Sequence, residues 1–168
     1  MSANPENASP GRQDPLAFYL DKSDPDTWQA VGVLRRAAMA AAKDAGLDLQ
    51  LIELVFLRVF QINGCAFCLN THLRAATKAG VSPQRMTLLP AWRDAEDVYS
   101  PLERAALALA EAVTELPEHE ELQVAQLMSH AELTDAQYAA VQWLAIVMNV
   151  TNRVSILSHH PVARATEA

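Results

Sequence analysis

Two helix-start signals restrict the fold of this chain more than any other feature. Ser100 stands three positions before Glu103, and Thr134 stands three positions before Gln137. In such a capping box the hydroxyl accepts a hydrogen bond from the third helical amide, and the Glu or Gln side chain bonds back to the amide of the capping residue. Apolar residues at helical spacing follow both signals, so each predicts the start of an amphipathic helix.

Further start and stop signals predict helices along nearly the whole chain. Proline in a first turn, preceded by Ser or Asp, favours a helix start, and glycine favours a helix end. We find no period-two alternation and no hairpin-type turn, so we expect no strands. The expected fold class is therefore all-α, a compact helical domain of about six or seven helices. The predicted helices span 28–45, 49–62, 65–80, 82–89, 100–116, 118–130 and 134–157.

The length and composition suit one folded domain between two tails. The chain has 168 residues, of which 51% are hydrophobic, and this is enough apolar material for one core. Residues 1–22 are predicted to be a disordered or extended tail, because their first part is rich in proline and has no apolar run. Residues 23–160 form the predicted domain, and residues 161–168 form a C-terminal tail.

Charge and hydropathy argue against several classes of partner. The formal net charge is −7 and the 13 Lys and Arg residues are scattered, so we expect no binding to nucleic acid. Polar residues interrupt the most apolar segment, 136–157, which therefore predicts a buried helix and no insertion into a membrane. The N-terminal segment has no apolar run of the secretory type, so we expect a cytoplasmic protein. We expect no cofactor.

The residues best placed for chemistry are Cys65, Cys68 and His72. On an α-helix, where each residue turns about 100°, these three fall within an arc of roughly 60° and share one face. Asn63-Gly64 precedes them, so Cys65 stands at a helix start whose backbone can adapt to a bond with Cys68. The positive end of the helix dipole favours a thiolate there, and a histidine four residues after Cys68 can take its proton.

Glu53 adds a carboxylate to this set of residues. It lies twelve residues before Cys65, in the apolar helix predicted at 49–62, where burying a charge without a partner costs several kcal/mol. If this helix and the next one pack as a hairpin, Glu53 can orient His72 or relay a proton.

Simpler interpretations of the cysteine pair stay open. Two small buried residues would fit, and so would a closed metal site with His72 as a third ligand, although no fourth ligand has the expected spacing. Haem attachment would need His directly after Cys68, where Leu69 stands, and a thioredoxin-type site should follow a strand. An iron–sulfur cluster would need more cysteines than the two present.

Several short motifs of this chain occur together in one known family. They are Gln-Ile-Asn-Gly-Cys-Ala-Phe-Cys at 61–68, within a segment that runs from Glu53 to His72, and shorter motifs at 78–80, 89–93 and 103–107. With them the chain resembles the alkylhydroperoxidase D-like branch of the carboxymuconolactone decarboxylase family. The resemblance covers about residues 25–157, and only the spacing of Glu, Cys-x-x-Cys and His within it bears on chemistry.

The resemblance implies a fold, an activity and a set of roles. Proteins of this branch are all-helical, assemble as homotrimers or hexamers, and reduce hydroperoxides through their cysteine pair. Carried onto this chain, Cys68 would be the peroxidatic cysteine and Cys65 the resolving one, while Glu53 and His72 would form the proton relay. The implied partners are a hydroperoxide substrate, a cellular dithiol reductant and further copies of the chain.

Two departures from the family pattern concern this same site. Well-studied relatives have His between the cysteines and many others have Tyr, whereas this chain has Phe67, which cannot carry a proton. Phe56 and Phe60 stand where relatives often have Lys and Ser, so we expect a more apolar pocket.

The leading hypothesis from the sequence is a thiol-dependent peroxidase that serves antioxidant defence. A decarboxylase or other lyase that acts on a small carboxylated ring is an alternative from the same fold, although that branch does not depend on a cysteine pair. A non-catalytic, redox-responsive oligomer is the other alternative, in which the dithiol reports oxidation without turnover.

Overall fold

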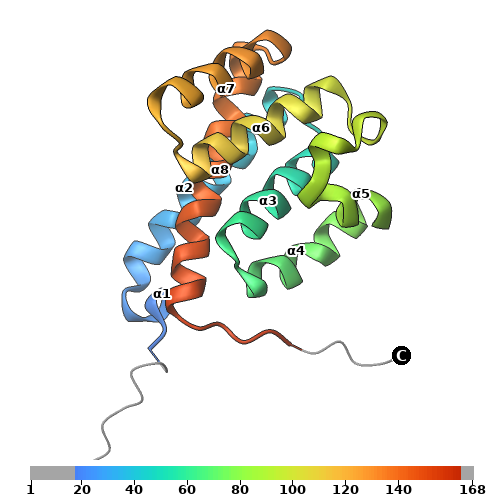
Figure 1. The fold of residues 1–168 in the computed structure, drawn as a ribbon. Helices are drawn as coiled ribbons and strands as arrows, with labels where there is room; N and C mark the ends of the chain where they lie inside the picture. The colour runs from blue at the N-terminus through green and yellow to red at the C-terminus, as the bar shows by residue number, and fades with distance from the viewer. Residues whose placement is uncertain (1–17, 164–168) are drawn as a thin grey trace, which may run out of the picture.

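Eight α-helices and two short 3-10 helices form the part of the chain that the computed structural model describes, residues 18–163, and no strand occurs there (Figure 1). The all-α fold expected from the sequence is therefore confirmed. In chain order the elements are α1 (Leu20–Ser23), α2 (Pro25–Asp44), α3 (Leu49–Asn63), α4 (Ala66–Ala79), α5 (Pro83–Leu88), η2 (Leu89–Asp94), η3 (Glu96–Val98), α6 (Pro101–Glu115), α7 (His119–Glu132) and α8 (Asp135–Leu157).

Side-chain caps start five of these helices where the sequence indicates a start. In each case the capping oxygen accepts a hydrogen bond from the backbone amide three residues later. Both predicted capping boxes are present, at the starts of α6 and α8. The five capping residues are Asp24, Asp48, Ser82, Ser100 and Thr134.

Two segments differ from the sequence prediction. The tail predicted for residues 1–22 includes most of α1, one helical turn whose Leu20 amide donates to Oγ of Ser158 at 2.9 Å. A contact across most of the chain leaves no local signal in the sequence, so the prediction missed this turn. The stretch 90–99, which lies between two of the predicted helices, contains most of η2 and all of η3. Residues 1–17 and 164–168 of the predicted tails lie outside the described residues.

Helix α3 lies at the centre of the helical packing (Figure 1). It packs against α4, α6 and α8, while α2 packs along α8. A helix enclosed on several faces needs apolar residues around most of its circumference, which explains why this stretch of sequence has no single apolar stripe. Its buried residues are Leu51, Ile52, Leu54, Val55, Phe56, Leu57, Val59 and Phe60.

The apolar segment 136–157 forms most of α8, as predicted. Its buried face includes Val141, Leu144 and Met148, which pack into the same core cluster as the buried residues of α2 and α3. Trp143, on another face of the helix, is 50% exposed. Within residues 18–163, no helix combines the length and the apolar character needed to cross a bilayer.

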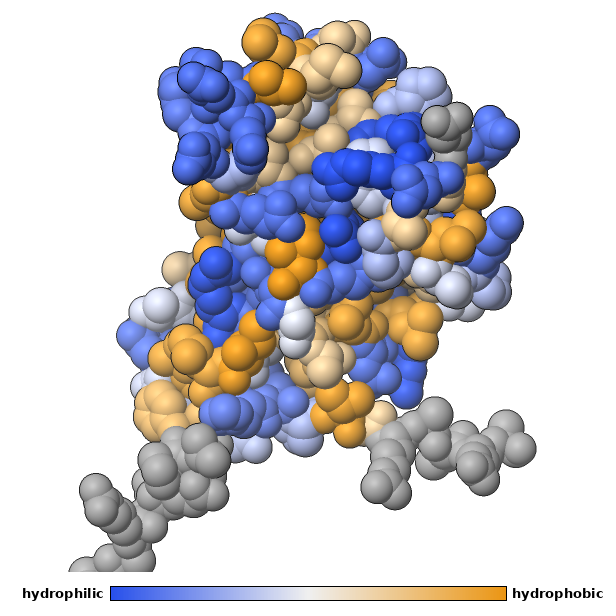
Figure 2. Space-filling model, viewed as in Figure 1, coloured by the Kyte–Doolittle hydropathy of each residue, from blue (hydrophilic) through white to orange (hydrophobic). Residues whose placement is uncertain are grey.

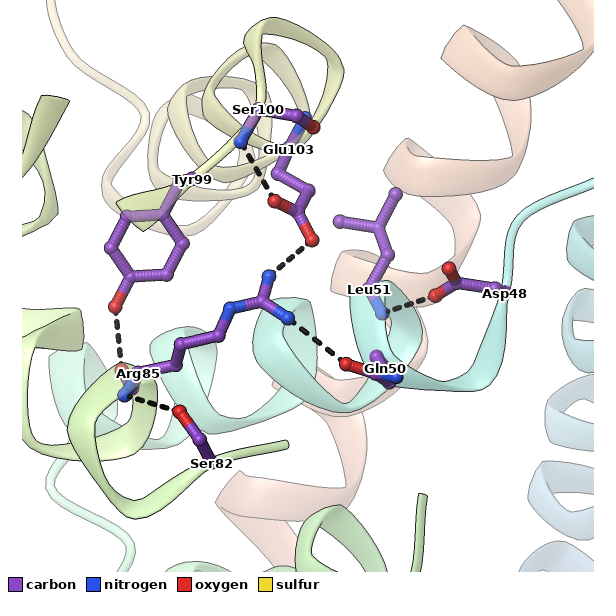
Figure 3. Close-up of polar contacts among 8 residues, drawn as sticks. All are labelled: Asp48, Gln50, Leu51, Ser82, Arg85, Tyr99, Ser100 and Glu103. Carbon is purple, nitrogen blue, oxygen red and sulfur yellow. Dashed lines mark hydrogen bonds and ion pairs between the residues drawn. The ribbon is translucent and has the colours of Figure 1, made fainter. Parts of the chain in front are cut away.

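Arg85 of α5 joins three helices beside this core (Figure 3). Its guanidinium donates to Oε1 of Gln50 in α3 at 3.0 Å and forms an ion pair with Glu103 in α6. Glu103 also accepts a hydrogen bond from the Ser100 amide at 2.8 Å, which completes the capping box. The Tyr99 hydroxyl donates to the Arg85 carbonyl oxygen at 2.5 Å, and burial raises the pKa of Tyr99. This network holds α5 and the start of α6 against α3.

A second ionic cluster surrounds Glu111 of α6. One of its oxygens accepts hydrogen bonds from Arg58 at 2.5 Å and Trp92 at 2.8 Å, and the other pairs with Arg93 at 2.5 Å. Burial alone would raise the pKa of Glu111, but the hydrogen bonds from these three donors outweigh burial and lower it. The motif at 89–93 therefore has a structural role, which is to brace α6 against α3 through Glu111.

Candidate active site

The two cysteines lie in the turn that joins α3 to α4. Gly64 ends α3 in the left-handed conformation, with a φ of 67°, which residues with a side chain adopt less readily. Cys65 then caps α4, and its Sγ accepts a hydrogen bond from the amide of Cys68 at 3.3 Å. The two sulfurs form a disulfide, with Cα atoms 5.3 Å apart. The site is therefore described in its oxidised state.

Asn63 anchors this turn to α8. Its Nδ2 donates to Oδ1 of Asn149 and to Oδ1 of Asn152, both at 2.9 Å. Because Asn63 is the last residue of α3 and lies two positions before Cys65, these bonds fix the disulfide relative to α8. The sequence analysis noted Asn63 only because, together with Gly64, it precedes Cys65. Its partners lie more than 80 residues away, so no local spacing indicates them.

Glu53 of α3 and His72 of α4 are brought together by the packing of these two helices. Nδ1 of His72 lies 2.8 Å from Oε2 of Glu53, and the two side chains are 14% and 12% exposed. The rings of Phe56 and Phe60 pack edge-on against the imidazole, with centroids 5.4 and 4.9 Å away. With Nδ1 engaged by the carboxylate, Nε2 remains available for proton exchange.

A pocket of about 250 Å³ opens beside Cys68 and His72. Cys65 does not line it and is only 1% exposed, so a molecule that enters the pocket meets Cys68. Phe60 contributes to the wall, whereas Phe56 is buried against His72 outside the lining. The lining residues are Asp21, Trp28, Arg35, Phe60, Phe67, Cys68, Thr71, His72, Met148, Thr151, Ser155 and His160.

The sequence analysis did not single out most of these lining residues, and three of those it missed contact one another. Asp21, Ser155 and His160 form a hydrogen-bonded chain that comes from both ends of the described structure. Asp21 and His160 are 139 positions apart, so only the folded structure reveals the pair. The two adjacent histidines at 159–160, beyond the last predicted helix, were the one signal available in the sequence.

This arrangement can support two-electron thiol chemistry at Cys68. A sulfur in the first turn of a helix, a histidine backed by a carboxylate and a second cysteine within bonding distance are the parts that such chemistry needs. Among residues 18–163, no cluster of three or more His, Cys, Asp or Glu side chains is arranged to hold a metal ion.

Comparisons with known proteins agree with this description. The sequence profile of the carboxymuconolactone decarboxylase family matches residues 29–112, which include Glu53, Cys65, Cys68 and His72. The uncharacterized protein YdfG of Bacillus subtilis is 35% identical over 114 residues, which are 68% of this chain and 77% of that protein.

A solved structure extends the similarity to most of the fold. It is the crystal structure of a protein of unknown function from Agrobacterium tumefaciens, for which a role as the antioxidant defence protein AhpD has been suggested. The two structures superpose with a TM-score of 0.78 at 28% sequence identity, over 89% of this chain and 99% of that one. From its sequence and its AhpD-like fold together, the chain belongs to the carboxymuconolactone decarboxylase family.

Proposed function

We propose that this protein is a thiol-dependent peroxidase that reduces hydroperoxides in antioxidant defence. The observation that carries the proposal is the position of Cys68, which lines a pocket together with His72 while Cys65 bonds it from the buried side. The similarity to the Agrobacterium protein, for which an antioxidant role has been suggested, also supports the proposal.

The first step takes place at Cys68 of the reduced protein. His72 accepts the thiol proton, and Glu53 stabilises the imidazolium that results, because the two side chains are in hydrogen-bond contact. The thiolate then attacks the terminal oxygen of the hydroperoxide. A sulfur–oxygen bond forms as the oxygen–oxygen bond breaks, sulfur gives up two electrons, and the leaving oxygen takes a proton to become an alcohol.

The second step joins the two cysteines. Cys65 attacks the sulfur of the Cys68 sulfenic acid, so a sulfur–sulfur bond forms while hydroxide leaves with a proton as water. The product is the disulfide present in the structure. A cellular dithiol then supplies two electrons and two protons to restore both thiols. Such dithiols are maintained in the cytoplasm, which is where the proposal places the protein.

Catalytic consumption of peroxide tests the proposal. The purified reduced protein would be mixed with cumene hydroperoxide and an excess of dithiothreitol, and peroxide loss per chain would be followed. We expect many turnovers, which Cys68→Ser abolishes. In the absence of dithiothreitol, Cys65→Ser should react with one equivalent of peroxide and stop, and dimedone should trap its sulfenic acid at Cys68. Trapping at Cys65 in the Cys68→Ser protein would reverse the roles of the two cysteines.

The same experiment separates the alternatives. Oxidation of both thiols by one equivalent of peroxide, without turnover under excess dithiothreitol, would favour a redox-responsive oligomer. If the thiols react with peroxide no faster than free cysteine does, the protein is not a peroxidase. That result would favour the decarboxylase or lyase activity.

A further inference from the structure

A second carboxylate–histidine pair lies in the pocket wall, and it continues into a hydroxyl group. Oδ1 of Asp21 is 3.1 Å from Nε2 of His160, and Nδ1 of His160 is 3.3 Å from Oγ of Ser155. All three residues line the same pocket as Cys68. The side chains of His160 and Asp21 are 13% and 18% exposed and Ser155 is buried, so water competes little for these bonds. They lie outside the family match at 29–112.

The backbone beyond α8 folds back and places His160 in this position. His159 has a φ of 47°, in the left-handed region that residues with a side chain seldom adopt. The amides of His159 and His160 then donate to the carbonyl oxygens of Ile156 and Ser155 at 3.1 and 3.2 Å. An unfavourable backbone conformation persists only where its surroundings hold it, and such conformations cluster at functional sites.

Contacts with α1 complete the support of this pair. Oγ of Ser158 accepts a hydrogen bond from the Leu20 amide at 2.9 Å, and the ring of Tyr19 stacks on that of His160 with centroids 5.5 Å apart. These contacts hold α1, which carries Asp21, against the end of α8, and Figure 1 shows the two side by side. The start and the end of the described chain therefore build one wall of the site together.

His160 also contacts Phe67, one of the two residues between the cysteines. Its ring packs edge-on against that of Phe67, with centroids 4.9 Å apart, and Phe67 immediately precedes Cys68. In a pocket of about 250 Å³, a hydroperoxide that reaches Cys68 also comes close to the wall that holds Ser155. The hydrogen-bonded chain therefore ends in the wall of the pocket that Cys68 also lines.

We propose that Asp21, His160 and Ser155 deliver the proton that the leaving oxygen of the hydroperoxide requires. This proposal rests on the peroxidase function proposed above. His72 serves the thiol of Cys68, and a separate donor for the leaving oxygen means that one histidine need not both remove a proton and supply one within the same step.

The protons balance along the chain of three residues. In the imidazolium form of His160, Nε2 donates to Asp21 and Nδ1 donates to Ser155, so the serine hydrogen is free to point into the pocket. When the oxygen–oxygen bond breaks, the hydroxyl of Ser155 gives its proton to the leaving oxygen and takes one from Nδ1 of His160. The alcohol departs, Asp21 stays ionised, and the neutral imidazole regains a proton from water.

Oxidants with different leaving groups test this role. Cumene hydroperoxide expels a strongly basic alkoxide that needs a proton, whereas peracetic acid expels acetate, which does not. The rate of sulfenic acid formation would be measured for both oxidants in the Cys65→Ser protein, alone and combined with His160→Asn or Ser155→Ala. His159→Asn is the matched control, because His159 is exposed and lies outside the pocket.

We expect His160→Asn and Ser155→Ala each to slow the reaction with cumene hydroperoxide by about 100-fold. Their reactions with peracetic acid and with iodoacetamide should change little, and His159→Asn should match its parent with all three reagents. His72→Gln should instead slow all three reactions, because it acts on the thiol. Thermal melting of each variant shows whether its fold is retained.

Two results would overturn the proposed proton delivery while leaving the peroxidase function intact. One is an equal loss of rate with cumene hydroperoxide and peracetic acid in either relay variant, and the other is no loss with either oxidant. If the Cys65→Ser parent reacts with cumene hydroperoxide no faster than free cysteine does, the result contradicts the proposed peroxidase function. The proposed proton delivery, which rests on that function, is then contradicted as well.

Discussion

Nδ1 of His72 and Oε2 of Glu53 lie 2.8 Å apart, where α4 packs against α3. The pair is almost enclosed, and Phe56 and Phe60 cover the imidazole edge-on. In such apolar surroundings a carboxylate stabilises the imidazolium that forms when histidine accepts a proton. Glu53 and His72 should therefore act on Cys68 as one unit.

This coupling can be measured as a double-mutant cycle. In the reduced Cys65→Ser protein, Glu53→Gln and His72→Ala should each slow alkylation of Cys68 by iodoacetamide at neutral pH and move the midpoint of its pH–rate profile upward. The double variant should be little worse than His72→Ala alone, because the carboxylate acts through the imidazole. Additive losses would indicate separate roles, and unchanged profiles would mean that no relay exists. Glu115→Gln, which alters an exposed carboxylate on α6, is the control.

The helices of this fold could be predicted from the sequence because their signals are local. The capping boxes at Ser100 and Thr134 and the glycine stop at Gly64 each act within one helical turn, and the structure contains all three. Helix α1 could not be predicted in this way. It is a single turn that depends on Ser158, at the far end of the chain.

The residues of the candidate site also fall into two groups, those that local spacing predicts and those that only the folded structure brings together. Cys65, Cys68 and His72 share one helix face, so their spacing indicates their proximity, and Glu53 follows once two neighbouring helices are assumed to pack together. The hydrogen bonds that join Asp21, His160 and Ser155 depend on the backbone beyond α8 and on the packing of α1 against the end of α8. Neither feature has a period or a motif in the sequence.

The buried carboxylate of Glu111 makes stability depend on pH. Glu111→Gln should lower the free energy of unfolding by about 3 kcal/mol at pH 7, because it leaves the half-buried Arg58 without its charged acceptor. The pKa of Glu111 in the folded state is below its ordinary value of 4.5, so the carboxylate stabilises the fold above that pH. This contribution is lost as the pH falls through the folded-state pKa.

Urea unfolding of the wild type and Glu111→Gln at pH 7 and at pH 3 checks this prediction. The difference in the free energy of unfolding between the two proteins should have its full value at pH 7 and be much smaller at pH 3. Glu115→Gln, on the same helix but exposed, should match the wild type at both values. A difference that stayed constant with pH would mean that packing, rather than charge, accounts for the effect of Glu111.

Exposed apolar side chains lead us to predict a homo-oligomer, a trimer or a hexamer. Figure 2 shows apolar side chains that interrupt the polar surface of one face. Trp143 and Ile146, about one turn apart on α8, are 50% and 40% exposed, and Val33 on the adjoining α2 is 53% exposed. Such residues favour burial against further copies of the chain.

Sedimentation at micromolar concentration tests the assembly. We expect a species several times heavier than the 18.4 kDa chain, and Trp143→Glu should shift it toward the monomer. Thr77→Glu makes the same change of charge on an exposed position of α4 and serves as the control. A wild-type protein that sediments as a monomer would contradict the prediction.

Position 67 offers a gain-of-function prediction. Phe67 lies between the cysteines in sequence, lines the pocket and contacts the ring of His160, but it carries no proton. Phe67→His would place an imidazole there, in the first turn of α4, where the helix dipole disfavours its charged form. The unperturbed pKa of histidine is about 6.5, so a fraction of the imidazole is still protonated near pH 7 and can donate a proton. The variant should therefore react with cumene hydroperoxide at least about 10-fold faster than the parent.

The same substitution should rescue a protein that lacks the second histidine. In the Cys65→Ser protein with His160→Asn, adding Phe67→His should restore most of the lost rate with cumene hydroperoxide, because it returns a proton carrier to the same wall of the pocket. Phe67→Leu in that background is the matched control, since it alters the packing against position 160 without supplying a proton. Stopped-flow rates of Cys68 oxidation would be compared for the two variants. If the His and Leu variants react equally fast, the gain comes from opening the pocket, and position 67 takes no part in proton transfer.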